Sequence, residues 1–376
     1  MLDQVRLLRA SERAATRFGE IPRYAEGLYE LAPGVYTWLV PNGSWGETNA
    51  GLIVAGGRSL LVDTPWDLDC TRQLQTLMGD VTERAPVRTV VNTHADGDHC
   101  WGNQLYANEE IVASRAAVAA MKHVTPASLV AFRRLGRALS ALPVVRARRV
   151  GAWFQGMIAP YDFSGVRLTL PNRVFSGELT LSVAGREVVL RELGPAHTDG
   201  DAIVFVPDAR VLFAGDLLFI DSTPPMWAGP IENWLHALDV IVGYDAHVIV
   251  PGHGPLTTRE GVLRMRNYLE FVAEHARSMH RDGVPPTAAA RRILAHPSFV
   301  AAGFLRWDSP ERVVTTVNSI YRHAGYNQWP HATLNQIRVL AAQAEVAAGM
   351  TEAAPAVMHV SARAQRAGVH RQEHNA

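Results

Sequence analysis

The chain has 376 residues, of which 48% are hydrophobic and 19% are charged, and its 36 Lys and Arg residues balance 36 Asp and Glu residues. This composition is typical of a globular protein with one large domain or two small ones. The balanced charge argues against the broad positive surface that nucleic acids require, so no nucleic-acid partner is expected. The two cysteines, Cys70 and Cys100, predict no disulfide framework and no CxxC chemistry.

The N-terminal residues 1–30 alternate charged and apolar positions, and we expect a polar, partly helical extension there. The sequence contains no signal-peptide core and no apolar run long enough to span a membrane. These features predict a cytoplasmic protein without membrane contact.

Short runs rich in β-branched and aromatic residues follow, separated by Gly, Pro and Asn turns, and they predict a series of strands. Strands are expected at residues 35–40, 50–55, 59–63 and 88–92, with a helix at residues 67–78.

Residues 115–160 interrupt the strand pattern. Apolar side chains recur there at helical spacing, at Phe132, Leu135, Leu139 and Leu142, and predict a helical insertion that packs near the mouth of a site. The arginines of this segment form either a solvated face or a site for an anionic substrate. The three that raise this question are Arg146, Arg148 and Arg149.

The second half of the chain returns to strands and then becomes helical. Hairpin strands are expected at 178–183 and 186–190, and again at 202–206 and 211–213, followed by a helix at 231–242 and a strand at 247–250. Helices are then expected at residues 258–280, 287–294, 310–323 and 331–347. Residues 348–376 are rich in alanine and charge and predict a disordered tail, in which His359, His370 and His374 are solvated.

The candidate chemistry is concentrated in the turn after the strand at residues 88–92. This turn carries His94, Asp96, Asp98 and His99 within six positions. Such a cluster is costly to bury without a partner, and a metal ion is the commonest partner. A solvated turn whose side chains cap a helix is the simpler alternative, but capping needs only one such group.

Three later segments strengthen the metal interpretation. His197 lies in a glycine-bracketed turn, Asp216 ends the apolar run at residues 211–216, and His253 follows the strand at 247–250 in the motif Pro-Gly-His-Gly. Ligands placed repeatedly at strand ends are how a β scaffold brings several side chains to one point.

This ordered set of motifs resembles the metallo-β-lactamase superfamily of metal-dependent hydrolases, and the resemblance covers the chain from about Gly34 to Pro255. It implies an α+β fold, an αββα sandwich. The catalytic domain would span residues 31–256 with the insertion at 115–160, and a C-terminal helical extension would span residues 257–347. The extension is expected to provide a packing surface or the surface of a homodimer.

The resemblance also implies the ligand set. One metal site would be formed by His94, the residue at position 96 and His197. The other would be formed by Asp98, His99 and His253, with Asp216 bridging the two. Zn²⁺ is the expected cofactor, with two ions bound.

Position 96 departs from the family pattern, since relatives usually have histidine where this chain has Asp96. A third carboxylate lowers the formal charge of the ligands plus two divalent ions by one unit. Oxygen donors favour harder ions, so Mn²⁺ or Fe²⁺ becomes an alternative to zinc. We predict that Asp96 is a ligand, and the competing interpretation leaves the first site weak or empty.

Several further residues are assigned supporting roles. Asp63 ends a strand and is expected to orient a ligand or, equally well, to cap a helix. Trp66, Trp101 and Trp227 lie on loops expected at the site and predict an aromatic pocket. Cys100 is expected to be a buried, inert thiol and Thr198 to hold the turn around His197.

The predicted function is hydrolysis of a small thioester, ester or lactone by a metal-bound hydroxide, with Asp98 and Asp216 orienting the nucleophile. Two alternatives stay open. His94, His197 and Asp216 alone would form the triad of a mononuclear Fe(II) enzyme that resembles persulfide dioxygenases. The protein would otherwise be a non-catalytic, metal-poor binding scaffold.

Overall fold

The computed structural model describes residues 2–326, 332–350 and 357. Within this part of the chain, the strands form an eight-stranded sheet in the order β1 to β8 and a five-stranded sheet in the order β13-β12-β11-β10-β9. The first sheet is antiparallel from β1 to β5 and parallel from β5 to β8. Its strands are β1 Arg6–Ala10, β2 Gly27–Ala32, β3 Val35–Leu39, β4 Ala50–Ala55, β5 Arg58–Val62, β6 Val87–Val91, β7 Glu110–Ser114 and β8 Arg173–Phe175.

The second sheet is antiparallel except between β12 and β13, which run parallel. Its strands are β9 Glu178–Val183, β10 Arg186–Glu192, β11 Ala202–Val206, β12 Val211–Phe219 and β13 Val248–His253. Strand β12 is buried along its whole length. Branched side chains of the two sheets, such as Ile53, Val91, Val188 and Val204, pack together in one buried cluster and form the core between the sheets.

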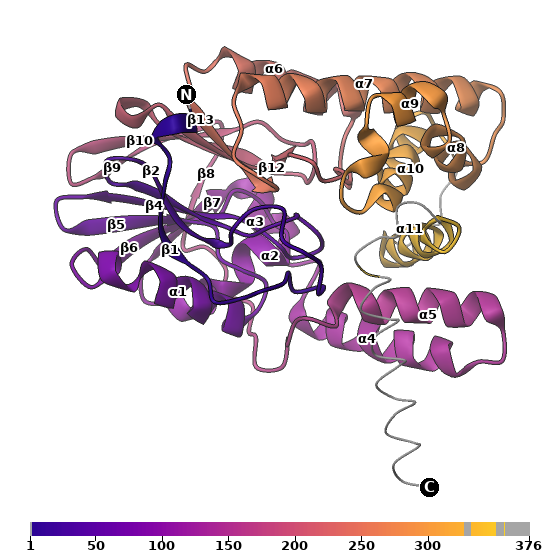
Figure 1. Ribbon diagram of the computed structural model, residues 1–376, viewed down its shortest axis with the longest axis horizontal. Helices are drawn as coiled ribbons and strands as arrows, with labels where there is room; N and C mark the ends of the chain where they lie inside the picture. Colours follow the sequence, from indigo (N-terminus) through magenta and orange to yellow (C-terminus); the bar gives the residue numbers. More distant parts are fainter. Residues whose placement is uncertain (1, 327–331, 351–356, 358–376) are drawn as a thin grey trace, which may run out of the picture.

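Helices cover the outer faces of both sheets (Figure 1). Helix α1 Leu68–Thr82 packs Leu74 and Met78 against the first sheet. Helices α6 Ile231–Gly243 and α7 Arg259–Arg281 bury their apolar faces, including Trp234, against the second sheet. The predicted αββα sandwich is therefore confirmed. The strand and helix predictions for residues 35–113 and 178–253 each match an element of the structure, with ends that differ by a few residues.

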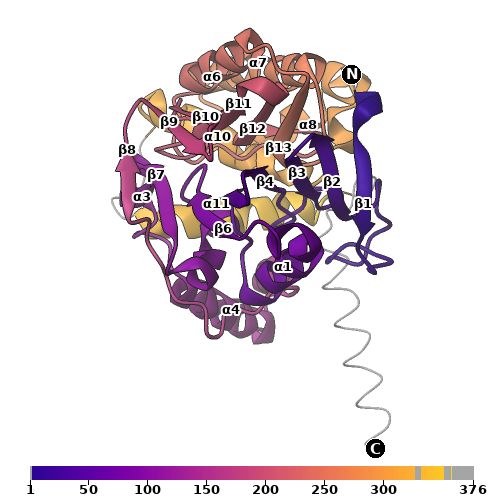
Figure 2. The ribbon, with the colours of Figure 1, turned by 90° about the vertical axis from the view of Figure 1, so that its left-hand side faces the viewer.

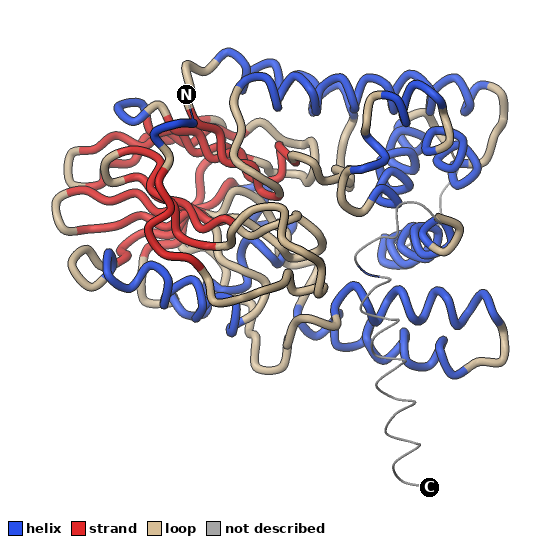
Figure 3. The backbone as a smooth tube through the Cα atoms, in the orientation of Figure 1, coloured by secondary structure: helices blue, strands red, loops and turns tan. Residues whose placement is uncertain are grey.

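The insertion between β7 and β8 is helical, as predicted. It contains α3 Arg115–Ala120, α4 Pro126–Ala141 and α5 Val145–Ile158, and α4 and α5 form an antiparallel hairpin beside the sandwich (Figure 3). Phe132 is buried and its ring stacks on Phe154. Leu142, which we expected on the same apolar stripe, lies beyond the end of α4 and is 45% exposed.

The C-terminal segment is also helical. It comprises α8 Pro286–Leu294, α9 Pro297–Ala301, η4 Phe304–Arg306, η5 Pro310–Arg312, α10 Val313–His323 and α11 Ala332–Ala347. Helix α10 packs on α7 and α8, and α11 contacts both α10 and α5. The C-terminal helices thereby tie the insertion to the sandwich. Trp307, Arg312 and Tyr321 are buried in this packing.

The N-terminal segment differs from the prediction. We expected a partly helical extension at residues 1–30, but apart from the short η1 Leu2–Gln4 the regular elements there are β1 and β2. Tertiary pairing explains the difference, because β2 pairs with β3 along its length and β1 pairs with β2 (Figure 2). Most of the predicted C-terminal tail lies outside the described residues, as do its three histidines.

Within the described residues, no helix combines the length and the apolar character needed to cross a membrane.

Candidate metal centre

The centre is built on the turn that follows β6. Asn92 holds this turn closed, because its side-chain amide donates to the His99 carbonyl at 2.9 Å. Helix α2 Gly97–Cys100 begins directly after Asp96, but the Asp96 side chain makes no capping hydrogen bond. The simpler explanation of the acidic turn as a helix cap therefore fails for Asp96.

The structure brings His94, Asp96 and His197 together, with ligand atoms all within 4.8 Å of one another. The Nε2 atom of His197 lies 3.2 Å from Asp96 Oδ2. Its Nδ1 atom is 2.6 Å from the carbonyl of Pro225 and donates to it, so Nε2 faces the centre. The Asp96 side chain is 36% exposed and marks the open side of the site.

The second predicted group, Asp98, His99 and His253, also converges within 4.8 Å. His253 Nδ1 donates to the Glu47 carbonyl at 3.0 Å, which directs its Nε2 toward Asp98 Oδ2 at 3.5 Å. Thr48 donates its hydroxyl to the same Asp98 oxygen at 2.9 Å. The side chains of this group are thus oriented by backbone and hydroxyl groups from outside the motifs.

Asp216 lies between the two groups. Its carboxylate is 3.0 Å from His99 Nε2, 3.3 Å from His197 Nε2, 3.4 Å from His253 Nε2 and 3.8 Å from His94 Nε2. Among the buried polar atoms without a hydrogen-bond partner in the described chain are His94 Nε2, His99 Nε2 and Asp216 Oδ1. Buried donor atoms that lie this close together without hydrogen bonds, as His99 Nε2 and Asp216 Oδ1 do at 3.0 Å, fit a bound divalent cation.

The pKa values in the centre are set by burial on one side and by the neighbouring charges on the other. Burial opposes the charged form of Asp216, but the surrounding histidines outweigh it and hold the pKa of Asp216 well below its usual range. Burial likewise opposes protonation of His99, yet Asp216 and Asp63 raise the pKa of His99 well above normal. Burial also opposes protonation of His197, but the hydrogen bond to Asp96 outweighs it and raises the pKa of His197 to about 9.

Asp63 supports His99, since its Oδ2 lies 2.9 Å from His99 Nδ1. The same carboxylate accepts from the backbone amide and the hydroxyl of Thr93 at 2.7 and 2.8 Å. Asp63 adopts a positive φ of 64°, an uncommon conformation that this set of contacts maintains. The alternative role of helix capping belongs to Asp67, which accepts from Cys70 N at 2.7 Å.

The prediction of an aromatic pocket is wrong for two of its three tryptophans. Trp66 and Trp101 are 7% and 1% exposed and pack with Tyr161 and Phe163 in a buried cluster, so they are core side chains. Trp227 is partly buried, and its backbone amide donates to the His197 carbonyl at 2.9 Å.

Cys100 is buried, and burial raises the pKa of its thiol well above normal, in agreement with an inert role. Thr198 donates to Asp201 through both its amide and its hydroxyl. Our prediction gave Asp201 no role, although its carboxylate fixes the His197 turn. Glu47 and Thr48 were also missed, because no spacing rule connects the loop before β4 to His253 at the end of β13 or to Asp98 in α2.

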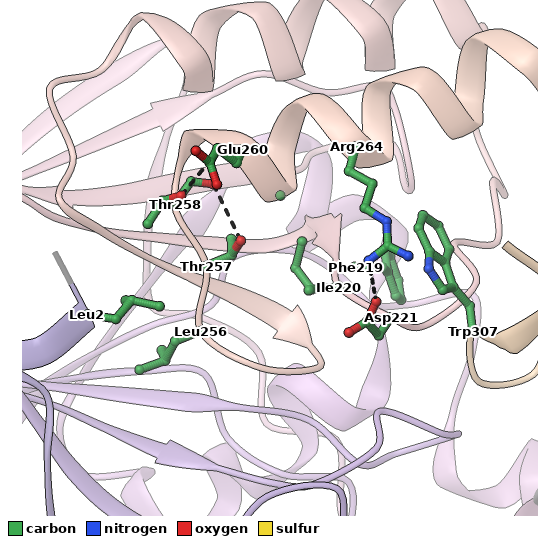
Figure 4. A pocket seen from close by; sticks show the side chains of 11 residues that line it. Leu2, Phe219, Ile220, Asp221, Leu256, Thr257, Thr258, Glu260, Arg264 and Trp307 are labelled. Atoms are coloured by element: carbon green, nitrogen blue, oxygen red, sulfur yellow. Dashed lines mark hydrogen bonds and ion pairs between the residues drawn. The ribbon is translucent and has the colours of Figure 1, made fainter. Parts of the chain in front are cut away.

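A separate pocket of about 360 Å³ lies between the end of β12 and the start of α7 (Figure 4). Phe219 lines it, and the same ring stacks on His253 with centroids 5.1 Å apart. Arg264 points toward Asp221 within this pocket, at 2.8 Å, with Trp307 beside it. None of the candidate ligands lines the pocket, so it is distinct from the metal centre.

The αββα sandwich and a histidine–aspartate centre at its strand ends define the class of protein. A family model described as the metallo-beta-lactamase superfamily matches residues 43–253, and the chain belongs to this superfamily. The superfamily includes metal-dependent hydrolases.

Individual relatives are more distant. The chain is 24% identical over 290 residues to "Linear primary-alkylsulfatase" from Pseudomonas sp. (strain ATCC 19151), covering 72% of this chain and 54% of the relative. It is 25% identical over 235 residues to "2,4-dinitroanisole O-demethylase subunit alpha" from Nocardioides sp. (strain JS1661), covering 60% of this chain and 59% of the relative. The chain thus spans little more than half the length of these relatives.

A solved structure of the stereoselective inverting sec-alkylsulfatase Pisa1 from Pseudomonas sp. aligns with a TM-score of 0.58 and 16% identity. The alignment covers 81% of this chain and 52% of that one. At this identity the likeness supports the fold alone.

Proposed function

We propose that this protein is a metal-dependent hydrolase that cleaves a thioester, ester or lactone bond of a small molecule with metal-activated water. The observation that carries the proposal is the position of Asp216, within 4 Å of four histidine side chains that come from three separate segments: His94 and His99 after β6, His197 after β10 and His253 at the end of β13. Such a set of nitrogen and oxygen donors suits Zn²⁺, and two ions are the occupancy that its two groups of ligands would accommodate.

A bound ion would polarise the substrate carbonyl and lower the pKa of a water molecule to ~7. The chain supplies the orientation. Thr48 fixes Asp98 beside His253, so that Asp98 can accept a hydrogen bond from the attacking water. Asp96 lies on the open side, where the substrate would enter.

A sulfate ester is the second candidate substrate. The observation that favours it is the relative named as a linear primary-alkylsulfatase, which matches 72% of this chain and therefore extends beyond the metal-binding motifs. β-Lactams are not favoured, although a relative named "Metallo-beta-lactamase type 2" from Bacteroides fragilis is 23% identical over 60% of the chain.

The first experiment is elemental analysis of protein purified without added metal, followed by assays on thioesters, esters, lactones and alkyl sulfates. Two zinc or manganese ions per chain and hydrolysis of one of these classes would support the proposal. A single iron with oxygen uptake in the presence of a thiol would favour the dioxygenase. Protein that contains no metal and is not stabilised by added metal would favour the non-catalytic binding scaffold.

The Asp98→Ala and His253→Ala variants test the residues directly. Each should lower kcat by at least ~100-fold, because each removes a group that holds the metal or its water. Far-UV circular dichroism checks that the fold is kept. Near-normal turnover by metal-free Asp98→Ala protein would contradict the proposed mechanism.

A further inference from the structure

The net charge of zero conceals a strong separation of charge along the chain. Residues 111–161 contain eight Lys and Arg residues and no Asp or Glu. The rest of the chain therefore carries 28 basic residues against 36 acidic ones. This basic segment comprises the end of β7 and all three helices of the insertion, of which α4 and α5 are the longest.

The loop between α4 and α5 exposes apolar side chains. It lies at the edge of the molecule away from both sheets (Figures 1 and 3). Leu142, Val144 and Val145 are 45%, 55% and 54% exposed, and Pro143 between them is exposed as well. Three exposed aliphatic side chains in four consecutive residues are unfavourable in water, and such a patch indicates a binding surface. We call these four residues the hairpin tip.

Basic side chains surround the hairpin tip. Arg137 lies five residues before Leu142 on α4, and Arg146, Arg148 and Arg149 lie in the first turns of α5. With a rise of ~1.5 Å per residue, all four lie within ~8 Å of the tip along the helix axes. We call these four residues the arginine collar.

Few of these charges are neutralised within the protein. Arg146 pairs with Glu345 of α11 at 2.5 Å, although its side chain remains 77% exposed. No ion pair of Arg137, Arg148 or Arg149 occurs within the part of the chain that the structure describes, and all three are exposed. The loop between α4 and α5 lies at the end of the hairpin away from the two sheets (Figure 1), and this position favours a solvated face over a substrate site for Arg146, Arg148 and Arg149.

We infer that the hairpin tip and the arginine collar bind an anionic lipid surface. Aliphatic side chains at the tip would enter the boundary between headgroups and acyl chains, which lies ~5–10 Å deep. The collar lies at the matching height for contact with anionic headgroups. Surface binding needs no membrane-spanning helix, and this inference is independent of the proposed function.

The partner must offer both negative charge and an apolar layer. Nucleic acid offers charge, but its phosphate backbone provides no layer that accepts Leu142, Val144 and Val145. A second copy of this chain could cover the tip, but it would have to place acidic groups around it. An anionic lipid surface offers an apolar layer to the hairpin tip and negative charge to the arginine collar at the same time.

The test is co-sedimentation of the full-length protein with vesicles of phosphatidylcholine alone or of equal parts phosphatidylcholine and phosphatidylglycerol. We expect binding to the anionic vesicles, little binding to the neutral ones, and release by high salt because salt screens the arginines. The Val144→Glu variant and the Arg148→Glu/Arg149→Glu variant should each reduce the bound fraction at least tenfold.

Matched controls use the same substitutions elsewhere on the surface. Val300→Glu changes a valine that is 47% exposed on α9, and Arg259→Glu/Arg281→Glu reverses two exposed arginines of α7. Both controls should bind the anionic vesicles as the unsubstituted protein does. All four variants should retain its circular dichroism spectrum, since every substituted side chain is exposed.

Three outcomes would overturn the inference. One is failure to bind anionic vesicles at low salt. Another is binding to heparin or RNA that the tip variant leaves unchanged, together with no binding to vesicles, since this would define a polyanion site. A third is a vesicle-free dimer that Val144→Glu converts to monomer, which would assign the tip to a second copy of the chain.

Discussion

Asp216 shows at the scale of single residues how a buried carboxylate is kept charged. It is 4% exposed, and the histidines within 4 Å hold its pKa well below normal against the cost of burial. The neighbouring histidines thus supply the positive charge that keeps this buried carboxylate ionised. The identity of each neighbour therefore matters for any cation that the centre binds.

Asp96 is the residue whose role is most open to test. Asp96→Ala should lose most of the metal of the first group, with kcat falling ~10–100-fold, because an oxygen donor beside His197 Nε2 disappears. Asp96→His should retain metal and shift selectivity from manganese or iron toward zinc. Metal content per chain and turnover with each added ion measure both effects. Unchanged metal content in Asp96→Ala would exclude Asp96 as a ligand.

Substitution of Asp63 tests whether its contact with His99 strengthens metal binding. Asp63→Asn keeps the shape but weakens the contact to His99 Nδ1, and metal affinity should fall ~10–100-fold. Asp67→Asn is the matched control, since Asp67 is also buried but caps α1. It should lower the unfolding free energy by ~1 kcal/mol and leave metal affinity unchanged. Equal metal affinities in both variants would contradict the role of Asp63.

At the scale of elements, the centre depends on how closely β12 and β13 approach. A side chain at Gly252 of β13 would place its Cβ atom 1.9 Å from Asp216 Oδ1. Glycine is therefore required beside the carboxylate. Gly215, which precedes Asp216, has a φ of 51°, and a Cβ atom there would lie 2.5 Å from the Thr93 hydroxyl oxygen. These two glycines give Asp216 the room to face four histidines.

Gly252→Ala should abolish tight metal binding and lower kcat by at least ~100-fold, because the carboxylate has to move. Gly79→Ala is the control. Gly79 lies inside α1 with open space around it, so alanine should raise stability by up to ~1 kcal/mol without affecting metal. Isothermal titration with Zn²⁺ and thermal unfolding distinguish the two. Normal zinc affinity in Gly252→Ala would show that the site relaxes around the added methyl group.

At the scale of the whole molecule, a buried polar layer joins the C-terminal helices to the sandwich. Arg312 of η5 donates to Ser222 at 3.2 Å, and its guanidinium lies over the ring of Trp45, 4.4 Å from the ring centroid. Trp45 in turn contacts Trp153 of α5 edge-on. Glu311 is completely buried beside Arg312, and burial raises the pKa of its carboxyl group from 4.5 to about 8.

This shift predicts a pH dependence of stability. Between pH 4.5 and about 8, Glu311 is protonated in the folded protein and ionised in the unfolded chain, so folding takes up a proton. Stability therefore falls as pH rises through this window, with a contribution of up to ~1.4 kcal/mol per pH unit. Glu311→Gln should remove that contribution, as urea unfolding at several pH values would show. The exposed Glu178→Gln should not change the slope, and an unchanged slope in Glu311→Gln would contradict the prediction.

The sequence by itself determined the local parts of this protein. Alternating and helical patterns predicted most strands and helices, and the order of the motifs around His94, His197, Asp216 and His253 predicted the superfamily. These signals are local, because each depends on the period of a single element or on the residues of a single turn.

The tertiary structure decided what depends on pairing and burial. Residues 6–10 and 27–32 became strands because β3 offers an edge to β2 and β2 offers one to β1. Trp66 and Trp101 are core side chains because the insertion covers them. Glu47, Asp201 and Gly252 have roles that only the folded chain shows, through their contacts with His253, Thr198 and Asp216 respectively. A contact between residues far apart in the chain leaves no periodic trace in the sequence, so only the assembled fold reveals it.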